Sequence, residues 1–568
     1  MKFCSIYFAL LLFFLKGNAQ FDTYPQGYFA NPLQIPISLS GNFGELRNNH
    51  YHMGLDFRTG GRVNLPVYAA ADGFISRIKV EPVGFGQSIS IDHPNGFTSL
   101  YAHLNGFTPE IEKWVKSHQY KESSWKITLY PEPKIFPVKK GMLIGYSGNT
   151  GGSQAPHLHF EIRRTYDEAC LNPLLFGFPL QDHQLPRILR MAVYDRTRST
   201  YEQSPELVSL KLETPGNYQT IPTLVKVKSP LISLAFSAFD SEDGSSNLNG
   251  IAAASLWVDG VKKISLMMDQ IGYENTRYFN AHIDYRTRIS GGPWLQHLSA
   301  LPGYRKSIYV PQTETGILSL KDGLVHDILI EVTDAYGNTA KLHSTIQWDG
   351  TNSQVSLVKK EGRIFYPGMM DVFESSTCEF FIGENALYDI AFVGHQSLVA
   401  LQGAVSELHQ IGAKWIPLQD SILIRLKPLR ILSPLEKDRM IMSWTNGIKK
   451  AVQKVEWQGT WAGARFRDFG NFQLIIDTIP PRIVPLNFKD GTDLSKSGSL
   501  IFSVKDNHEK IEHVNTYLDG KWLRFSNDKN LAFLYRMDEN FPAGLHELKI
   551  EAVDVAGNAS SAVFYLKR

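Results

Sequence analysis

The sequence predicts a mostly β protein built from several modules, and three features of its 568 residues indicate this class. Apolar and polar residues alternate over residues 157–163, which is the period of a half-buried strand. Residues 87–103 contain two alternating runs around a Pro-Asn-Gly turn, the signal of a β-hairpin. Residues 326–338 and 546–558 repeat one strand-and-turn pattern. The length of the chain also favours several domains over one.

Residues 1–19 are expected to form a signal peptide. Lys2 precedes an apolar run over residues 6–15, and Gly17-Asn18-Ala19 gives the small-residue pattern of a signal peptidase site. A transmembrane anchor is the less favoured alternative, because this run is short for a bilayer span. We therefore expect an exported protein with no transmembrane anchor after signal removal. Periplasm, cell surface and medium all stay open as its location.

The charges of the chain nearly cancel, with 58 Lys and Arg residues against 56 Asp and Glu residues. This balance suggests neither nucleic acid nor an anionic membrane as a partner. Two cysteines remain after signal removal, Cys170 and Cys378. They could pair, but nothing in the sequence requires it, and the protein is not predicted to depend on disulfides.

The first candidate site motif is HMGLD, which spans His52 to Asp56. Metal ligand atoms lie about 2 Å from one ion, whereas residues i and i+4 on a straight strand are about 13 Å apart. The segment must therefore bend if both residues bind one metal, and Gly54 permits a sharp turn. Arg47, a few residues upstream, is read as a surface residue in preference to a cleft residue.

Two further segments supply histidines. His157 and His159 share one face of the predicted strand, with Cβ atoms about 6.5 to 7 Å apart. Alone, such a pair would be read as two solvated histidines. The hairpin at residues 87–103 adds His103, which stands at the end of its second strand beside the candidate site. The combination of motifs favours a functional site over the solvated alternative.

The motifs HxGxD, YAHL, and GNTG followed by PHLHFEI occur in this order, and they resemble the lysostaphin-type zinc endopeptidase family of peptidoglycan hydrolases. The resemblance covers about residues 39–179. It implies that one zinc ion is held by His52, Asp56 and His159, and that His103 and His157 are catalytic. No other cofactor is expected.

The residue types fit this chemistry by themselves. Two imidazoles and one carboxylate leave the fourth position of a tetrahedral zinc open for water, as in a catalytic site. One additional histidine can take the proton of that water, and another can donate to the oxyanion. The sequence does not distinguish which of His103 and His157 has which role.

Residues 108–137 form a segment that looks longer than the corresponding link in compact members of that family. Thr108, Pro109 and Glu110 predict a helix start with a capping hydroxyl. Ile111, Trp114 and Val115 would then lie on one face. The helix is expected either to pack on the peptidase body or to wall one side of the cleft.

The repeated segments, together with the matching runs at residues 234–240 and 501–506, predict two immunoglobulin-like sandwiches. Turn aspartates in these repeats could bind calcium, although turn geometry alone accounts for them. The expected domains are a signal peptide (1–19), a zinc endopeptidase domain (20–186), an immunoglobulin-like module with an insertion (187–350), a β module (351–478) and an immunoglobulin-like module (479–568).

The signal peptide and the resemblance together imply an exported zinc metalloendopeptidase that hydrolyses amide bonds in peptidoglycan peptides. The alternative is a non-catalytic cell-wall or surface binding protein that keeps the peptidase fold for recognition. Since all five metal and catalytic positions are occupied, the enzyme is favoured. The β modules are expected to position it and could bind a protein partner.

Overall fold

The computed structural model describes residues 24–245, 247–303, 308–310, 314–351, 362–447, 449–530 and 532–568. The expected signal peptide lies outside these residues. Strands dominate throughout, which confirms the mostly β prediction. Among the residues described, no helix is both long enough and apolar enough to cross a membrane.

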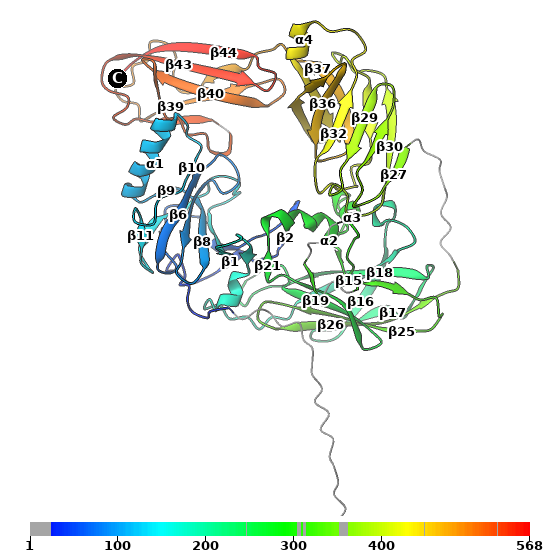
Figure 1. Cartoon of the computed structure of the whole chain (residues 1–568). Helices are drawn as coiled ribbons and strands as arrows, with labels where there is room; N and C mark the ends of the chain where they lie inside the picture. The colour runs from blue at the N-terminus through cyan, green and yellow to red at the C-terminus, as the bar shows by residue number, and fades with distance from the viewer. Residues whose placement is uncertain are drawn as a thin grey trace, which may run out of the picture.

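Four regions follow one another along the chain. We call them the peptidase region (24–186), the first β module (187–348), the middle β module (362–477) and the C-terminal β module (482–568). Figure 1 shows them arranged as a ring in which the C-terminal module returns to the peptidase region beside helix α1.

The peptidase region is built on one antiparallel sheet. The central strands follow in the order β1 (Leu39–Gly41), β4 (Leu55–Arg58), β13 (His157–Arg164), β8 (Phe97–Leu104), β7 (Gln87–Asp92), β6 (Gly73–Val80) and β10 (Ile127–Leu129). β14 (Cys170–Leu171) and β11 (Pro137–Val138) pair at its edges. A second small sheet contains β5 (Pro66–Tyr68), β12 (Leu143–Tyr146) and β9 (Gly106–Phe107), and β2 (Leu46–Arg47) pairs with β3 (His50–Tyr51).

The strand order brings the three sequence motifs together. β13 lies between β4 and β8, and His159 stands opposite Asp56 on one side and Ala102 on the other. The predicted hairpin is confirmed as β7 and β8. The predicted bend is confirmed at Gly54, where a Cβ would meet the Phe160 carbonyl oxygen at 2.3 Å. Only glycine allows this close approach.

The predicted helix is confirmed as α1 (Pro109–Glu122), with Thr108 at its N-cap. The expectation of a capping hydroxyl is wrong, because the Thr108 side chain makes no cap hydrogen bond. Ile111 and Val115 are buried in the peptidase core, and Trp114 packs against it. One face of the helix therefore packs on the peptidase body.

The first β module contains one large sheet. Its strands are β15 (Arg187–Asp195), β16 (Glu206–Thr214), β17 (Asn217–Val227), β18 (Leu231–Phe239), β19 (Ala253–Val258), β20 (Val261–Met267), β22 (Gln296–His297), β23 (Tyr309–Val310), β24 (Ile317–Ser319), β25 (His326–Thr333) and β26 (Thr339–Trp348). Between β20 and β22 the chain forms β21 (Gln270–Ile271), η3 (Tyr273–Tyr278), α2 (Phe279–His282) and α3 (Tyr285–Ile289). β21 pairs with β14 of the peptidase region, so this excursion joins the two regions.

The middle module consists of two sheets. One contains β27 (Gly362–Phe365), β30 (Ala391–Leu398), β31 (Leu408–Ile411), β37 (Gly470–Ile476), β33 (Met440–Thr445) and β34 (Lys450–Lys454). The other contains β28 (Asp371–Glu374), β29 (Cys378–Ile382), β32 (Ile422–Leu426), β36 (Trp461–Phe466) and β35 (Glu456–Gln458), and α4 spans Pro434–Asp438.

The C-terminal module also has two sheets. Their strands are β38 (Arg482–Pro485), β39 (Ser499–Lys505) and β42 (Phe533–Arg536) in one, and β41 (Lys521–Trp522), β40 (Ile511–Leu518), β43 (Leu545–Asp554) and β44 (Ala559–Lys567) in the other.

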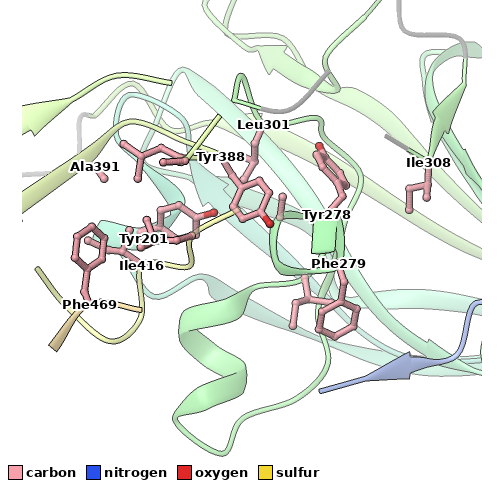
Figure 2. Packing of buried hydrophobic residues seen from close by; sticks show 14 of the residues in the cluster. Tyr201, Tyr278, Phe279, Leu301, Ile308, Tyr388, Ala391, Ile416 and Phe469 are labelled. Carbon is pink, nitrogen blue, oxygen red and sulfur yellow. The ribbon is translucent and has the colours of Figure 1, made fainter. Parts of the chain in front are cut away.

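The hydrophobic cores do not follow the four regions. A single apolar cluster runs from the peptidase residues Phe43 and Tyr51 through the first module into the middle module. Figure 2 shows part of it, where Tyr278 and Tyr388 pack together. The C-terminal module has a separate core of its own. Cys170 and Cys378 are both buried and both free thiols.

Candidate metal centre and active site

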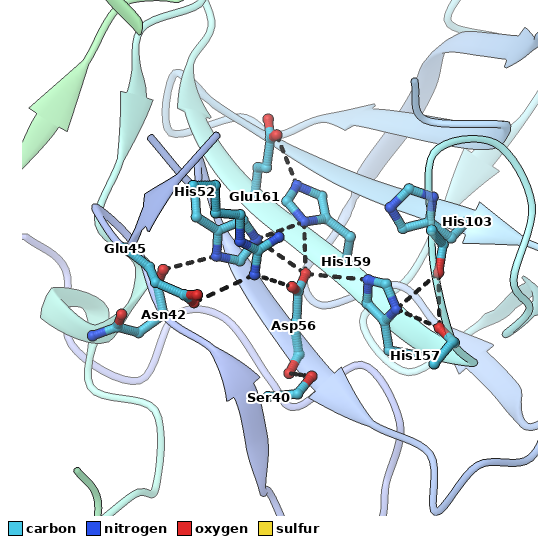
Figure 3. A network of polar contacts seen from close by, with 12 residues as sticks. Ser40, Asn42, Glu45, His52, Asp56, His103, His157, His159 and Glu161 are labelled. Atoms are coloured by element: carbon cyan, nitrogen blue, oxygen red, sulfur yellow. Dashed lines mark hydrogen bonds and ion pairs between the residues drawn. The ribbon is translucent and has the colours of Figure 1, made fainter. Parts of the chain in front are cut away.

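The three predicted metal ligands converge on one point. His52 follows the β2–β3 hairpin, Asp56 lies on β4 and His159 on β13. The His52 Nε2, Asp56 Oδ1 and His159 Nδ1 atoms lie 2.9 to 3.0 Å from one another (Figure 3). Ligands of a tetrahedral zinc, at about 2.0 to 2.1 Å from the ion, are about 3.3 Å apart. The cluster therefore fits one zinc ion with little adjustment.

Hydrogen bonds fix which nitrogen of each imidazole faces the cluster. His52 Nδ1 donates to the Asn42 carbonyl oxygen at 2.7 Å, which leaves Nε2 as the nitrogen that can bind a metal ion. His159 Nε2 donates to Glu161 Oε1 at 2.9 Å, which leaves Nδ1. Such partners hold the ligand tautomer and ring orientation at metal sites. The two histidines thus present different nitrogens to one point.

Arg47 is part of this site. One of its guanidinium nitrogens donates to Asp56 Oδ2 at 2.6 Å, while Oδ1 of the same carboxylate faces the histidines. Glu45 lies on the other side of Arg47, at 3.4 Å. Reading Arg47 as a surface residue was therefore wrong, because the β2–β3 hairpin folds it onto the carboxylate.

The two other predicted histidines lie beside the cluster. His103 Nδ1 donates to the Thr150 carbonyl oxygen at 2.8 Å, and His157 Nδ1 donates to the Ala155 carbonyl oxygen at 2.8 Å. Their ring centres are 4.8 Å apart, and that of His103 is 5.8 Å from that of His159. His157 Nε2 is 3.3 Å from Asp56 Oδ1. All five predicted residues therefore meet in one place.

Burial sets the charge of these groups. It lowers the pKa of His52 to about 4 and that of His103 to about 3, so both imidazoles are neutral near pH 7. Burial alone would also lower the pKa of His159, but its hydrogen bonds to Asp56 and Glu161 raise it to about 9. The surrounding imidazoles hold the pKa of Asp56 well below its usual range despite burial. A carboxylate and neutral imidazoles are the forms that bind metal, so His159 would release its Nδ1 proton when a metal ion binds.

Glu161, which accepts a hydrogen bond from His159, is itself held by residues outside the cluster. It is fully buried on β13, and Arg163 Nε donates to its Oε2 at 2.7 Å. The Tyr273 hydroxyl, which comes from η3 of the first β module, donates to Oε1 at 2.8 Å. Glu161 could have been found from the sequence, since it lies two residues after His159 on the same strand face. Tyr273 gives no such local signal.

The C-terminal module contacts the opposite side of the site. Asp528 Oδ1 accepts a hydrogen bond from the Gly151 amide at 2.8 Å, and Lys529 Nζ donates to the Ser153 carbonyl oxygen. The loop over residues 148–153 also carries the Thr150 carbonyl that orients His103. Nearby, Arg524 Nε donates to Gln119 Oε1 of α1 at 2.5 Å. The sequence does not predict these contacts.

The fold and the site together define a domain of the metallopeptidase class. Comparison with known proteins agrees with this. Residues 50–120 match the model of Peptidase family M23, and residues 363–477 match that of the Zu5-like domain. The peptidase region is thus an M23, or lysostaphin-type, domain, which confirms the resemblance carried by the motifs.

Relatives match through the same part of the chain. An uncharacterized metalloprotease of Haemophilus influenzae is 29% identical over 168 residues, which cover 28% of this chain and 30% of that protein. The DD-carboxypeptidase/endopeptidase Mpg of Neisseria meningitidis is 33% identical over 158 residues, covering 27% and 30%. The peptidoglycan DD-endopeptidase ShyA of Vibrio cholerae is 27% identical over 147 residues, covering 25% and 28%. The chain thus spans under a third of each of these relatives.

Proposed function

We propose that this protein is an exported, zinc-dependent endopeptidase that hydrolyses amide bonds in peptidoglycan peptides. The observation that carries the proposal is the convergence of three ligand atoms within 3.0 Å of one another, with two further histidines beside them. The M23 match and the endopeptidase names of two relatives support the reaction and the substrate class. The domain limits expected from the sequence, and the immunoglobulin-like nature of two modules, are part of this proposal.

In this proposal His52 Nε2, Asp56 Oδ1 and His159 Nδ1 hold the zinc ion. A bound zinc would supply a Lewis acid for the scissile carbonyl and lower the pKa of water. Arg47 holds the second Asp56 oxygen and so aims Oδ1 at the cluster. Glu161 fixes the His159 tautomer in the same way. These partners support binding of the metal before substrate arrives.

The proton transfers are assigned to His103 and His157. Each donates its Nδ1 hydrogen to a backbone carbonyl, so Nε2 is the nitrogen that each has available for proton transfer. Because burial keeps His103 neutral, we assign it as the acceptor of the water proton. His157 lies next to Asp56, and we assign it to the oxyanion or the leaving amine.

A non-catalytic wall-binding protein is the second candidate. A wall-binding protein would need the peptidase fold for recognition. It would not need the three predicted ligands and two predicted catalytic histidines to converge. Retention of all five favours hydrolysis. A protein partner bound through the β modules is compatible with either function.

The test is incubation of the chain from Gln20 with purified peptidoglycan, followed by mass analysis of the soluble fragments. We expect peptide-bond cleavage that a chelator abolishes and added zinc restores. The His103→Ala variant is the matched control, because it should keep the zinc and release fragments about 10²-fold or more slowly. Binding to the wall without any cleavage by the zinc-loaded protein would favour the second candidate.

Export is tested separately. The chain produced in a diderm host should be recovered outside the cytoplasm with Gln20 as its first residue. Full-length protein retained in the cytoplasm would contradict the signal peptide and leave the hydrolytic proposal untouched.

A further inference from the structure

A second group of buried acids lies at the start of the first β module, away from the M23 site. Asp182 precedes β15, Asp240 follows β18 and Asp334 follows β25. Each offers one carboxylate oxygen, and the three atoms lie within 4.8 Å of one another. Glu242, two residues after Asp240, is buried beside them. We call these four residues the first acidic cluster.

The C-terminal module repeats this arrangement. Asp477 lies at the end of the middle module, Asp506 follows β39 and Asp554 ends β43. Their carboxylate oxygens also lie within 4.8 Å of one another. We call them the second acidic cluster. In each cluster one aspartate comes from the segment before the module and the other two come from strand ends within it.

The hydrogen bonds around the two clusters match. Asn338 Nδ2 donates to the Asp182 carbonyl oxygen at 3.0 Å and to Asp334 Oδ2 at 2.7 Å. In the second cluster Asn558 plays the same part. Its Nδ2 donates to the Asp477 carbonyl oxygen at 3.0 Å and to Asp554 Oδ2 at 2.9 Å. The two clusters are therefore built to one plan.

Both clusters keep oxygens that nothing else binds. Asp182 Oδ2, Asp240 Oδ1 and Glu242 Oε1 are buried without a hydrogen-bond partner, in side chains of residues only 4 to 7% exposed. The equivalent atoms of the second cluster, Asp477 Oδ2 and Asp506 Oδ1, are also without one. Among the described residues no Lys, Arg or His forms an ion pair with either cluster; His183, the nearest in sequence, pairs with Asp243.

Unpaired buried carboxylates are costly unless they take up a proton or a cation. In the first cluster, burial and mutual repulsion raise the pKa of Asp240 to about 8 and that of Glu242 to about 7. Without a cation these groups would therefore hold protons near neutral pH. A cation at the shared point would replace those protons and satisfy the free oxygens.

We propose that each acidic cluster binds one calcium ion. The clusters offer oxygen donors alone, and several carboxylates around one point suit a hard divalent cation. His and Cys, which would favour zinc or copper, take no part in either cluster.

Each ion would fasten a module to the segment that precedes it. Asp182 belongs to the link from the peptidase region, and Asp477 to the link from the middle module. The sites thus stand at two of the boundaries between regions, just before β15 and just before β38. Their role is structural and independent of the zinc chemistry.

The experiment is calcium binding to the chain from Gln20, freed of metal by dialysis against a chelating resin and then reloaded with zinc. Calorimetry and equilibrium dialysis should give two calcium ions per chain. Asp240→Asn should remove one, Asp506→Asn the other, and the double variant both. Zinc content should stay the same in all of them. Asp243→Asn and Glu509→Gln, which change exposed acids near each cluster, are the matched controls and should keep both ions.

Thermal unfolding gives a second readout. Calcium should raise the Tm of the parent chain and leave the Tm of the double variant unchanged. An ion that binds only the folded state stabilises the folded state. If Asp240→Asn fails to fold, Glu242→Gln should still weaken the first site tenfold or more. Failure of the parent chain to bind calcium at millimolar concentration, or two ions retained by the double variant, would overturn the proposal.

Discussion

The first β module and the C-terminal module both touch the M23 site, but they support different halves of it. The first module supports the predicted ligands, because Tyr273 holds Glu161 behind His159 and Gly250 holds Asn42 behind His52. The C-terminal module contacts the loop at residues 148–153, which orients the predicted catalytic histidines.

The two contacts also differ in kind. The first module shares an apolar core with Phe43, Tyr51 and Met53 of the peptidase region. The C-terminal module keeps its own core and reaches the loop through polar groups. The predicted ligands thus rest on a core shared with the first module, whereas the loop beside the predicted catalytic histidines meets the C-terminal module through a few hydrogen bonds.

The largest effect is expected for the ligands themselves. Asp56→Ala and His159→Ala should each lose zinc and all measurable hydrolysis, since each removes one of three protein ligands. Elemental analysis of the purified variants checks this. Stoichiometric zinc in both variants would show that the ligands have been assigned wrongly.

The two predicted catalytic histidines, beside the loop at residues 148–153, should affect the rate but not the zinc content. His103→Ala and His157→Ala should keep zinc and lose about 10²-fold or more in kcat, the usual cost of a lost proton-transfer or oxyanion group. Zinc and rate must be measured on the same samples. Loss of zinc from either variant would make that histidine a ligand and remove the distinction between the two sides.

Two buried histidines of the first module, His282 and His297, should each cost the module stability in acid, an effect read from the difference between the parent chain and the His282→Asn variant. Burial lowers the pKa of His282 and of His297 to about 3, against 6.5 in an unfolded chain. Below pH 6.5 the unfolded state therefore takes up protons that the folded state does not. The free energy of unfolding contributed by each histidine decreases as the pH is lowered from 6.5 to about 3. At pH 5 the loss is roughly 2 kcal/mol per histidine.

Urea unfolding at pH 7 and pH 5 measures this loss. His282→Asn should reduce it, and His513→Asn, at the surface of the C-terminal module, should not. An equal loss of unfolding free energy between pH 7 and pH 5 in the parent chain and in His282→Asn would show that His282 does not contribute to it.

Tyr273→Phe tests support of the ligands from outside the M23 domain. The variant removes the hydroxyl that donates to Glu161, and zinc affinity should fall about tenfold, as for comparable changes behind metal ligands. The rate at saturating zinc should change little. Tyr166→Phe, an exposed tyrosine of the peptidase region, is the control. Equal zinc affinity in the two variants would show that the Tyr273 contact from the first module does not support metal binding.

The smallest effect is expected for Asp528→Ala. It removes the acceptor of the Gly151 amide, and a lost hydrogen bond of this kind should lower kcat about 2- to 10-fold with zinc unchanged. Asp528→Asn keeps an acceptor oxygen and should retain most of the rate. An increased rate in Asp528→Ala would mean that the C-terminal module restrains the site.

Much of the site could be predicted because its motifs are local. The period of two over residues 157–163 places His157 and His159 on one face, and Gly54 makes the bend between His52 and Asp56 possible. The structure brings these residues and His103 together, while their individual roles remain predictions.

The rest depended on contacts between distant segments. Arg47 was misread because Asn48 and Asn49 favour a turn there but nothing local shows that the β2–β3 hairpin folds against Asp56. Tyr273 is 112 residues from Glu161, in an insertion with no repeat to align it. The sequence favoured turn geometry over calcium for the turn aspartates, because the oxygens without a partner belong to residues far apart in each segment of the chain.

The return of the C-terminal module to the peptidase region sets an order of events during synthesis. Gly151 and Asp528 are separated by 377 positions, and a ribosome delivers the loop long before its partner. The core around the ligands can form once the first module has emerged. The loop at residues 148–153 gains its last contacts only when the C-terminal module folds. A chain that folds from its N-terminus as it emerges on export would therefore assemble the predicted ligands first and the loop beside the predicted catalytic histidines last.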